Sequence, residues 1–330
     1  MSVYLAWINA SLPSRHLCLD LRSTTEHASR CITPSTNIPS TELHLRWSEL
    51  PPKQTPFAIL LSRHETDALD AIQSRHWQVP WILYAEDDTI WTEAARQGRL
   101  QEGSSPLDPT LPPRPWLLFQ PSAYLSRHIQ RIESASTGTW WKCLDIGCGA
   151  GRDLAWLLAR NHHQSRWRVT GMDNWTGSIQ RTHQIVWGMH LESFVDGIVK
   201  ARVRVDGTWH HTTTRQGTTE FFCNADIFSD ANEGADRFQL VMMIRFMSRP
   251  LLKDLPLLLV PGGYLLISHF LHVEGHVYET PKEEDRVKPG ELAQTYRDYE
   301  WNGIKMVILD DVVEHTEDGR PLNSILCQRI

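Results

Sequence analysis

Several signatures that would assign the chain to a common class are missing. Its six cysteines include no Cys-x-x-Cys pair, so neither a disulfide framework nor a zinc site is indicated, and we expect a reducing compartment. No run reaches the roughly 18 apolar residues of a membrane helix, and no basic segment followed by an apolar run marks a signal peptide. We therefore expect a cytoplasmic protein, with the nucleus as the alternative, and neither a metal nor a membrane partner.

A surplus of positive charge is also missing. The chain has 33 Lys and Arg against 39 Asp and Glu, a net charge of -6. This balance argues against a general affinity for nucleic acid, although it leaves room for a local basic patch. With 41% hydrophobic and 22% charged residues, the 330-residue chain has the composition of a globular protein with one large or two ordinary domains.

The most informative segment spans residues 141–158. It predicts a buried strand, a tight turn through Gly147, Gly149 and Gly151, and a helix with one apolar side. Two phosphate-binding motifs are absent from it. A dinucleotide fingerprint needs glycine where Arg152 stands, and a P-loop needs Gly-Lys-Ser/Thr. An acid, Asp145, precedes the turn instead; it suits a cationic ligand and would repel a pyrophosphate.

The pattern Asp145-x-Gly147-x-Gly149-x-Gly151 resembles motif I of class I S-adenosylmethionine (SAM)-dependent methyltransferases. The resemblance implies SAM as cofactor and a methyl transfer as reaction. Asp173 ends a second predicted strand about 20 residues beyond the turn, where doubly wound folds place a carboxylate for ribose hydroxyls. The cofactor-binding residues that the resemblance implies are Asp145, Gly147, Cys148, Gly149, Gly151, Asp173, Asn174, Asp226 and Ile227.

Asp226 and Ile227 belong to residues 220–228, which we interpret as the third strand and its exit, at the adenine of the cofactor. Before it, Asp206-Gly207 predicts an inserted hairpin in residues 199–219. The paired histidines of the chain (His162 and His163, His210 and His211) are interpreted as solvated loop residues and not as metal ligands.

Two catalytic candidates follow the fourth and fifth predicted strands. Arg245 ends residues 238–245 and either holds an anionic substrate or forms a structural ion pair. His269 lies at the end of the fifth predicted strand, in residues 261–270, and is either a general base or a residue that orients a neighbour. A helix is expected between these strands, over residues 250–260, and a mobile cover is expected over residues 276–289.

The resemblance covers residues 121–330 and implies an α/β fold: a seven-stranded Rossmann-like sheet with an antiparallel final hairpin. A helix before the first strand is expected to start at Ser122 and to bury Tyr124, Leu125, Ile129 and Ile132. The domain is distantly similar to tellurite-resistance-type methyltransferases. It lacks an Asn-Pro-Pro-Tyr/Phe motif after the fourth strand, which argues against methylation of base or glutamine amino groups.

Residues 1–90 resemble a rhodanese-like domain, a smaller α/β domain, through Asp20-x-Arg22, the capping-box pattern Ser23 to Glu26, and the run that ends at Pro39. The loop after the strand 57–61 starts with Ser62 where a working rhodanese has a nucleophilic cysteine. We expect an inactive rhodanese-like fold; the alternative is a sulfurtransferase with a displaced thiol, Cys18 or Cys31. Residues 91–120 are interpreted as a Pro-rich linker.

The sequence thus predicts a SAM-dependent methyltransferase with a small-molecule acceptor. Two alternatives stay open: an RNA or protein methyltransferase that docks through the rhodanese-like domain, and a non-catalytic SAM-binding regulator. The acceptor atom and the oligomeric state do not follow from the sequence.

Overall fold

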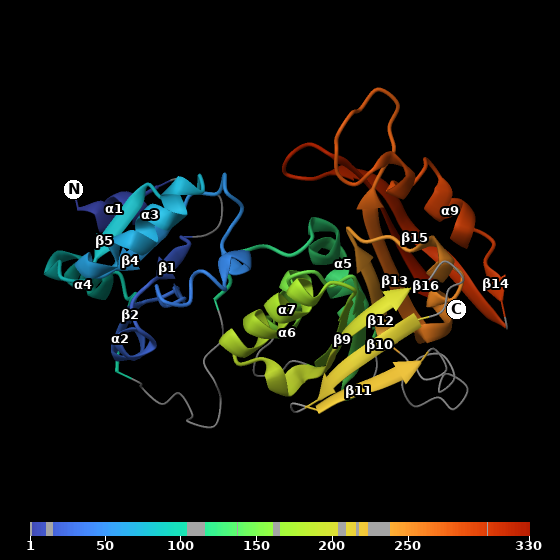
Figure 1. The fold of residues 1–330 in the computed structure, drawn as a ribbon, viewed down its shortest axis with the longest axis horizontal. Coiled ribbons are helices and arrows are strands. Elements are labelled where there is room, and N and C mark those ends of the chain that lie inside the picture. The colour runs from blue at the N-terminus through green and yellow to red at the C-terminus, as the bar shows by residue number, and fades with distance from the viewer. Residues whose placement is uncertain are drawn as a thin grey trace. The chain divides into compact units, whose positions relative to one another are not determined.

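The structure is a computed structural model that describes residues 2–10, 16–103, 116–136, 138–160, 166–203, 209–215, 218–223, 238–301 and 303–330. The chain divides into two compact units, Met1–Gln120 and Pro121–Ile330 (Figure 1). The predicted methyltransferase domain starts at the same residue as the second unit. Among the described residues, no helix has the length and apolar character needed to cross a membrane.

The first unit is built on a parallel four-stranded sheet in the order β3-β1-β4-β5. Leu19, Ile59 and Leu61 pack in one hydrophobic cluster of the unit, and Leu60 and Leu83 pack in another, so residues on both faces of the sheet are buried. Its strands are β1 (Cys18–Asp20), β3 (Thr36–Asn37), β4 (Ala58–Leu61) and β5 (Trp81–Tyr84), and a second sheet pairs β2 (Arg30–Ile32) with β6 (Leu100–Glu102).

In the described part of the first unit, the α-helices are α1 (Val3–Ile8), α2 (Thr24–Ser29), α3 (Thr66–Ser74) and α4 (Asp88–Arg96). The predicted capping box of α2 is confirmed, since Ser23 Oγ accepts from the N–H of Glu26 and the Glu26 carboxylate accepts from the N–H of Ser23. The predicted end of this domain near residue 90 is wrong. Helix α4 and strand β6 belong to the unit, and Leu118, in the expected linker, packs in its core.

The second unit contains a ten-stranded sheet in the order β11-β10-β9-β8-β7-β12-β13-β16-β15-β14, so the expected count of seven strands is wrong. The five central strands, in the order β9-β8-β7-β12-β13, pair with one another in parallel, whereas β13 with β16 and β16 with β15 pair antiparallel. The predicted antiparallel final hairpin is thus confirmed. The bounds are β7 (Trp141–Ile146), β8 (Trp167–Asp173), β9 (Val195–Val203), β10 (Trp209–Arg215), β11 (Thr218–Cys223), β12 (Phe238–Ile244), β13 (Leu259–Phe270), β14 (Glu300–Trp301), β15 (Ile304–His315) and β16 (Pro321–Arg329).

The predicted third strand is also wrong. The neighbour of β8 is β9, not the segment that starts at residue 220. Strand β11 lies two places further out, because β9 turns back into β10 and β10 into β11, both antiparallel. The expected hairpin exists, but its first strand is part of the central sheet. Asp206, Gly207, Asp226 and Ile227 lie outside the described residues.

The helices α5 (Ala123–Ala135), α6 (Arg152–Ala159) and α7 (Thr176–Gly188) lie on one side of this sheet and α9 (Glu291–Tyr296) on the other (Figure 1). Helix α5 starts after Ser122 and buries Tyr124, Leu125, Ile129 and Ile132, as the sequence predicts. The helix expected over residues 250–260 is replaced by two short 3-10 turns, and β13 already starts at Leu259.

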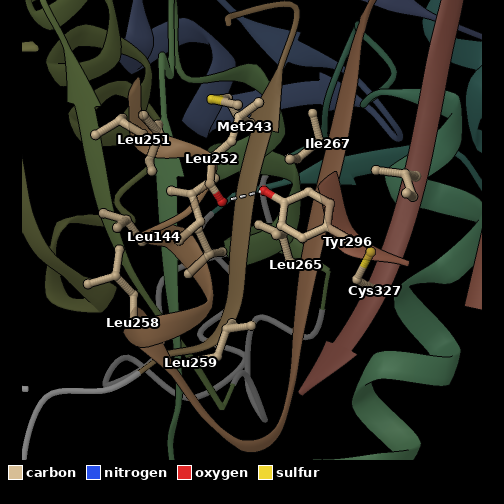
Figure 2. Close-up of a cluster of buried hydrophobic side chains, with 14 of the residues drawn as sticks. Leu144, Met243, Leu251, Leu252, Leu258, Leu259, Leu265, Ile267, Tyr296 and Cys327 are labelled. Atoms are coloured by element: carbon tan, nitrogen blue, oxygen red, sulfur yellow. Dashed lines mark hydrogen bonds between the residues drawn. The ribbon is translucent and has the colours of Figure 1, made fainter. Parts of the chain in front are cut away.

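A hydrophobic cluster fills the space between the sheet and α9 (Figure 2). Leu144, Met243 and Ile267 come from three adjacent strands and pack with Leu252 and Tyr296, and the Tyr296 hydroxyl donates to the Leu252 carbonyl at 2.8 Å. Removing a buried side chain of this size costs about 3–5 kcal/mol. This cluster fixes β7, β12 and β13 relative to one another and so positions the loops that follow them.

Candidate functional site

The order β9-β8-β7-β12-β13 has a switch point between β7 and β12, where the chain changes the direction in which it adds strands. In open parallel sheets, ligands bind beyond the carboxyl ends of the strands at such a point. Here the glycine turn, residues 147–151, follows β7, and Arg245 and Phe246 follow β12. The topology therefore brings the predicted cofactor turn and one catalytic candidate to the same edge of the sheet.

The glycine turn requires its glycines for different reasons. Gly147, Gly149 and Gly151 have φ angles of +77°, +59° and +76°, a region that side chains disfavour. A Cβ atom on Gly147 would lie 2.3 Å from the Phe246 side chain, and one on Gly151 would lie 2.9 Å from Thr182. No described heavy atom lies within 4 Å of the Cβ position of Gly149, so this glycine borders open space.

The N–H groups at the start of the turn are bonded to the end of β8. Gly147 N and Cys148 N both donate to the Met172 carbonyl, at 2.7 and 2.9 Å, and Gly149 N donates to Asp173 Oδ2 at 3.0 Å. Asp173 Oδ1 accepts from Trp175 N at 2.8 Å. A carboxylate has about four acceptor positions, so Asp173 keeps capacity for ligand hydroxyls.

Two further carboxylates surround the turn. Burial raises the pKa of Asp145 well above its usual range, and the charges of Asp153 and Asp173 raise it further. Burial also raises the pKa of Asp153, which accepts a hydrogen bond from Ser122 N at 2.6 Å. A bound cation would offset the cost of ionising these acids, whereas a phosphate would add to it, so the cluster favours a cationic ligand.

Asp153 was missed by the sequence reasoning. Its signal is an acid in the first turn of the helix that follows the glycine turn, and nothing local shows that it meets the start of α5.

Of the other predicted cofactor residues, Cys148 is buried against Thr182, with Sγ and Oγ1 3.6 Å apart. Burial, and next the charge of Asp145, raise the pKa of this thiol well above its usual range, which leaves it protonated and unreactive. Asn174 is exposed beyond β8, and the neighbouring Trp175 is 59% exposed.

Arg245 is exposed and adopts φ +55°, a left-handed conformation that costs a non-glycine residue about 1–3 kcal/mol. Its N–H donates to the Ser268 carbonyl on β13 at 2.7 Å. The conformation turns the chain sharply at the end of β12 and brings Phe246 onto Gly147. The positive charge of Arg245 acts on Asp153, where it lowers the pKa that burial raises.

His269 lies near the end of β13 and is 4% exposed. Its Nε2 lies 3.1 Å from the Asp285 carbonyl, and burial lowers the pKa of the imidazole to about 4, so the ring is neutral at pH 7. The structure places His269 one strand beyond Arg245 in the sheet order, at the same edge.

The segment 271–288 lies over this end of β13 and is tied by specific bonds. Val287 N donates to the Phe270 carbonyl at 2.9 Å, and Arg249 Nη2 donates to the Arg286 carbonyl at 2.6 Å. Arg249 also pairs with Glu291, Nε to Oε1 2.6 Å. The position of the expected cover is thus defined, and its mobility stays a prediction. Among the described residues, no group of three or more His, Cys, Asp or Glu side chains could hold a metal ion.

The second unit is thus an open α/β sheet with a glycine turn and acids at its switch point, an architecture that binds nucleotide-type ligands. The chain belongs to the family of the uncharacterized protein UNK4.09 of Schizosaccharomyces pombe: the two are 30% identical over 332 residues, which cover 95% of this chain and 93% of that protein. The similarity extends over both units. No protein-family model matches the chain.

Solved structures that resemble the chain include a SAM-dependent methyltransferase from Aquifex aeolicus, with 15% identity over 61% of this chain and 88% of that one and a TM-score of 0.37. They also include TehB from Haemophilus influenzae, with 18% identity over 61% and 62% and a TM-score of 0.34. A third is the [4+2]-cyclase SpnF, with 12% identity over 61% and 79% and a TM-score of 0.40.

Proposed function

We propose that the second unit binds SAM at the switch point between β7 and β12 and transfers its methyl group to a small-molecule acceptor. The observation that carries this proposal is the acidic glycine turn: Asp173 accepts the N–H of Gly149, the charges of Asp153 and Asp173 act on Asp145, and Gly149 borders open space. SAM carries an ammonium and a sulfonium, and a bound cation would favour the ionised form of Asp145, which burial and the neighbouring acids disfavour. Its ribose hydroxyls fit the remaining acceptor capacity of Asp173.

The residues at the proposed site would have different tasks in that reaction. Asp145 and Asp153 stabilise positive charge, and Asp173 orients the ribose. SAM supplies a methyl group on a sulfonium that is already activated. The protein mainly has to align the acceptor with that methyl and to exclude water. The tied segment 271–288 limits access of water to the end of β13, and the neutral His269 there accepts a proton or a hydrogen bond.

The test is calorimetry of the full chain with SAM and with S-adenosylhomocysteine, for the wild type and for Asp173→Ala. We expect binding that falls at least tenfold in the variant. Thr89→Ala, an exposed substitution in the first unit, is the control and should bind as the wild type does. Failure of the folded wild type to bind either compound would refute the proposal.

The identity of the methyl acceptor distinguishes a small-molecule methyltransferase from an RNA or protein methyltransferase and from a non-catalytic regulator. The burial of His269 under the segment 271–288 supports a small acceptor over an RNA or a protein. Transfer of label from SAM to a filtrate of small metabolites, with none to RNA or protein fractions, would agree with it. Transfer to a macromolecule would favour docking through the first unit, and SAM binding without any transfer would favour a non-catalytic regulator.

We further propose that the first unit is a rhodanese-like module without sulfurtransferase activity. In the turn after β4, the Glu65 carboxylate accepts from Ser62 N at 2.8 Å and from Ser40 Oγ at 2.9 Å. The backbone N–H groups of Ser62 and Arg63, the first two of this turn, are therefore already bonded to the carboxylates of Glu65 and Glu86. Burial raises the pKa of both displaced thiols, Cys18 and Cys31, so neither is a good nucleophile. Thiocyanate production from thiosulfate and cyanide by the wild type would contradict this.

A further inference from the structure

Two buried hydrogen-bond acceptors without partners face the same side of the sheet in the second unit. His269 on β13 and Asn323 on β16 are directly paired across the antiparallel ladder. The two residues are 4% and 5% exposed. Neither Nδ1 of His269 nor Oδ1 of Asn323 has a hydrogen-bond partner among the described residues. Directly opposite residues have Cβ atoms roughly 5 Å apart, so the two side chains lie next to each other on one face of the sheet.

The surrounding bonds determine that both atoms are acceptors. A backbone carbonyl can only accept, so the Asp285 carbonyl fixes the proton of His269 on Nε2 and leaves Nδ1 with a lone pair. The amide of Asn323 donates through Nδ2 to Asp311 Oδ1 at 2.8 Å and to the Val312 carbonyl at 3.3 Å, which fixes Oδ1 as the free end. Two acceptors cannot satisfy each other, so the site requires a donor from elsewhere.

The position of the pair relates it to the proposed methyl transfer. Ser268, the residue before His269, accepts the N–H of Arg245 through its carbonyl, and Phe246 then packs on Gly147. Strands β7, β12 and β13 are consecutive in the sheet, so two strand spacings, roughly 10 Å, separate the glycine turn from His269. A cofactor at the turn and a small acceptor at His269 therefore fit along one edge.

We propose that His269 and Asn323 bind the methyl acceptor through its own hydrogen-bond donors, so that the acceptor is a small molecule with a hydroxyl or amino group. Asn323 is then a substrate-binding residue, and the pair selects against compounds whose donors are already methylated. This inference rests on the proposed methyltransferase function only for the identity of the bound compound, since the donor requirement follows from the two acceptors themselves.

The experiment uses the full chain with ¹⁵N-labelled histidine and small probes in pairs: phenol with anisole, and aniline with N,N-dimethylaniline. The Nδ1 signal of His269, assigned with His269→Gln, should move upfield with phenol or aniline and stay in place with the methylated partner. In Asn323→Leu the affinity for the responding probe should fall about tenfold. Ser324→Ala, on the same strand but on the other face, is the matched control and should bind as the wild type does.

Each outcome decides the inference. A signal that responds to none of the four probes, or equally to both members of a pair, would overturn it and leave a buried water as the donor. SAM titrated into the same samples by calorimetry tests the proposed function separately. A protein that binds phenol or aniline at His269 but not SAM would keep this inference and lose the methyltransferase proposal.

Discussion

The carboxylate of Asp173 accepts a hydrogen bond from the backbone N–H of Gly149, with 3.0 Å between Oδ2 and N. Its other oxygen accepts from Trp175 N at 2.8 Å. The acid at the end of β8 is thus fixed by two backbone donors, and one of them belongs to the glycine turn after β7. These bonds hold Gly149, Asp173 and Trp175 together around the proposed position of the ribose.

Replacement of Asp173 by asparagine tests this arrangement. The amide has one acceptor oxygen, so its NH₂ group must face either Gly149 N–H or Trp175 N–H. We expect SAM binding to weaken about 10- to 100-fold, because one backbone donor and one ribose hydroxyl lose their acceptor. Calorimetry measures the change. Wild-type affinity in the variant would show that the carboxylate does not contact the cofactor.

Gly147 and Gly149 should respond differently to alanine. Both have positive φ angles, which costs alanine about 1–2 kcal/mol. At Gly147 the added methyl also meets Phe246 at 2.3 Å, so overpacking adds roughly 1–3 kcal/mol. Gly147→Ala should therefore lower the stability of the second unit clearly more than Gly149→Ala does.

Gly149→Ala places its methyl in open space, so its main effect should be on the ligand. We expect it to lose SAM binding while its Tm falls only by the amount that the positive φ angle costs, as followed by scanning calorimetry with and without SAM. Equal stability losses in the two variants would contradict the packing of Phe246 on Gly147. Unchanged SAM affinity in Gly149→Ala would place the cofactor elsewhere.

Local patterns predicted the parts of the second unit that depend on neighbours in sequence. The strand, turn and helix from Trp141 to Ala159 follow from apolar periodicity and glycines, and the final hairpin follows from two β-rich runs around Gly319. The third strand was assigned wrongly because residues 195–203 and 218–223 both form strands. Only pairing with β8, a long-range contact, decides which of them lies in the central sheet.

The same limit applies to the site. The positions of Asp145 and Asp173 near the glycine turn could be predicted, because Asp145 lies close to the end of β7 and Asp173 ends β8; their role in binding the cofactor stays a prediction. Asp153 and Asn323 could not be predicted, since their importance depends on Ser122 N and on the register of β16 against β13. The helix α4 was missed although Asp87 caps it and Ile90, Trp91 and Ala94 form a buried side, because proline-rich sequence follows closely.

Asp145→Asn should make the second unit more stable and weaken its binding of SAM. The raised pKa of Asp145 means that its ionised form destabilises the fold. The stability that the neutral acid contributes is complete below the pKa of the unfolded chain, and it is lost as the pH rises through the higher pKa of the folded protein. At pH 7 the amide should therefore raise the Tm of the second unit by roughly 2–4 °C, the change that 1 kcal/mol produces in a domain of this size.

SAM binding by Asp145→Asn should fall at the same time, because an amide, unlike the carboxyl group, cannot ionise to pair with a bound cation. Scanning calorimetry and titration on one preparation measure both quantities. A variant that is less stable and still binds SAM normally would contradict the role of Asp145 as a charge held for the ligand.

The first unit offers a test of its proposed inactivity. Ser62→Cys restores a thiol at the start of the turn after β4, yet we expect no sulfurtransferase activity. The Glu65 carboxylate still accepts the N–H of residue 62 and places a negative charge beside the thiol, which disfavours the thiolate. Ser62→Cys combined with Glu65→Gln is the matched comparison, assayed with thiosulfate and cyanide. Sulfurtransferase activity in the single variant would show that the turn can stabilise a persulfide, and the proposed inactivity would then be wrong.

His269 should make the second unit sensitive to mild acid. Burial lowers the pKa of its imidazole to about 4, below the value of about 6.5 in an unfolded chain. Between these values the unfolded state binds a proton that the folded state does not. The stability that the neutral ring contributes is therefore complete above pH 6.5 and is lost as the pH falls toward 4, by at most about 3 kcal/mol.

The substitution His269→Gln keeps an amide donor for the Asp285 carbonyl and removes the titration. The Tm of the second unit, measured from pH 7.5 to pH 4.5, should fall less steeply in His269→Gln than in the wild type, and the two curves should converge at the acid end. An NMR titration of His269 with a midpoint near pH 6.5, or parallel Tm curves, would mean that the ring is solvated in the folded protein. In that case Nδ1 would not be a buried acceptor, and the selection of a donor-bearing substrate by His269 and Asn323 would fail with it.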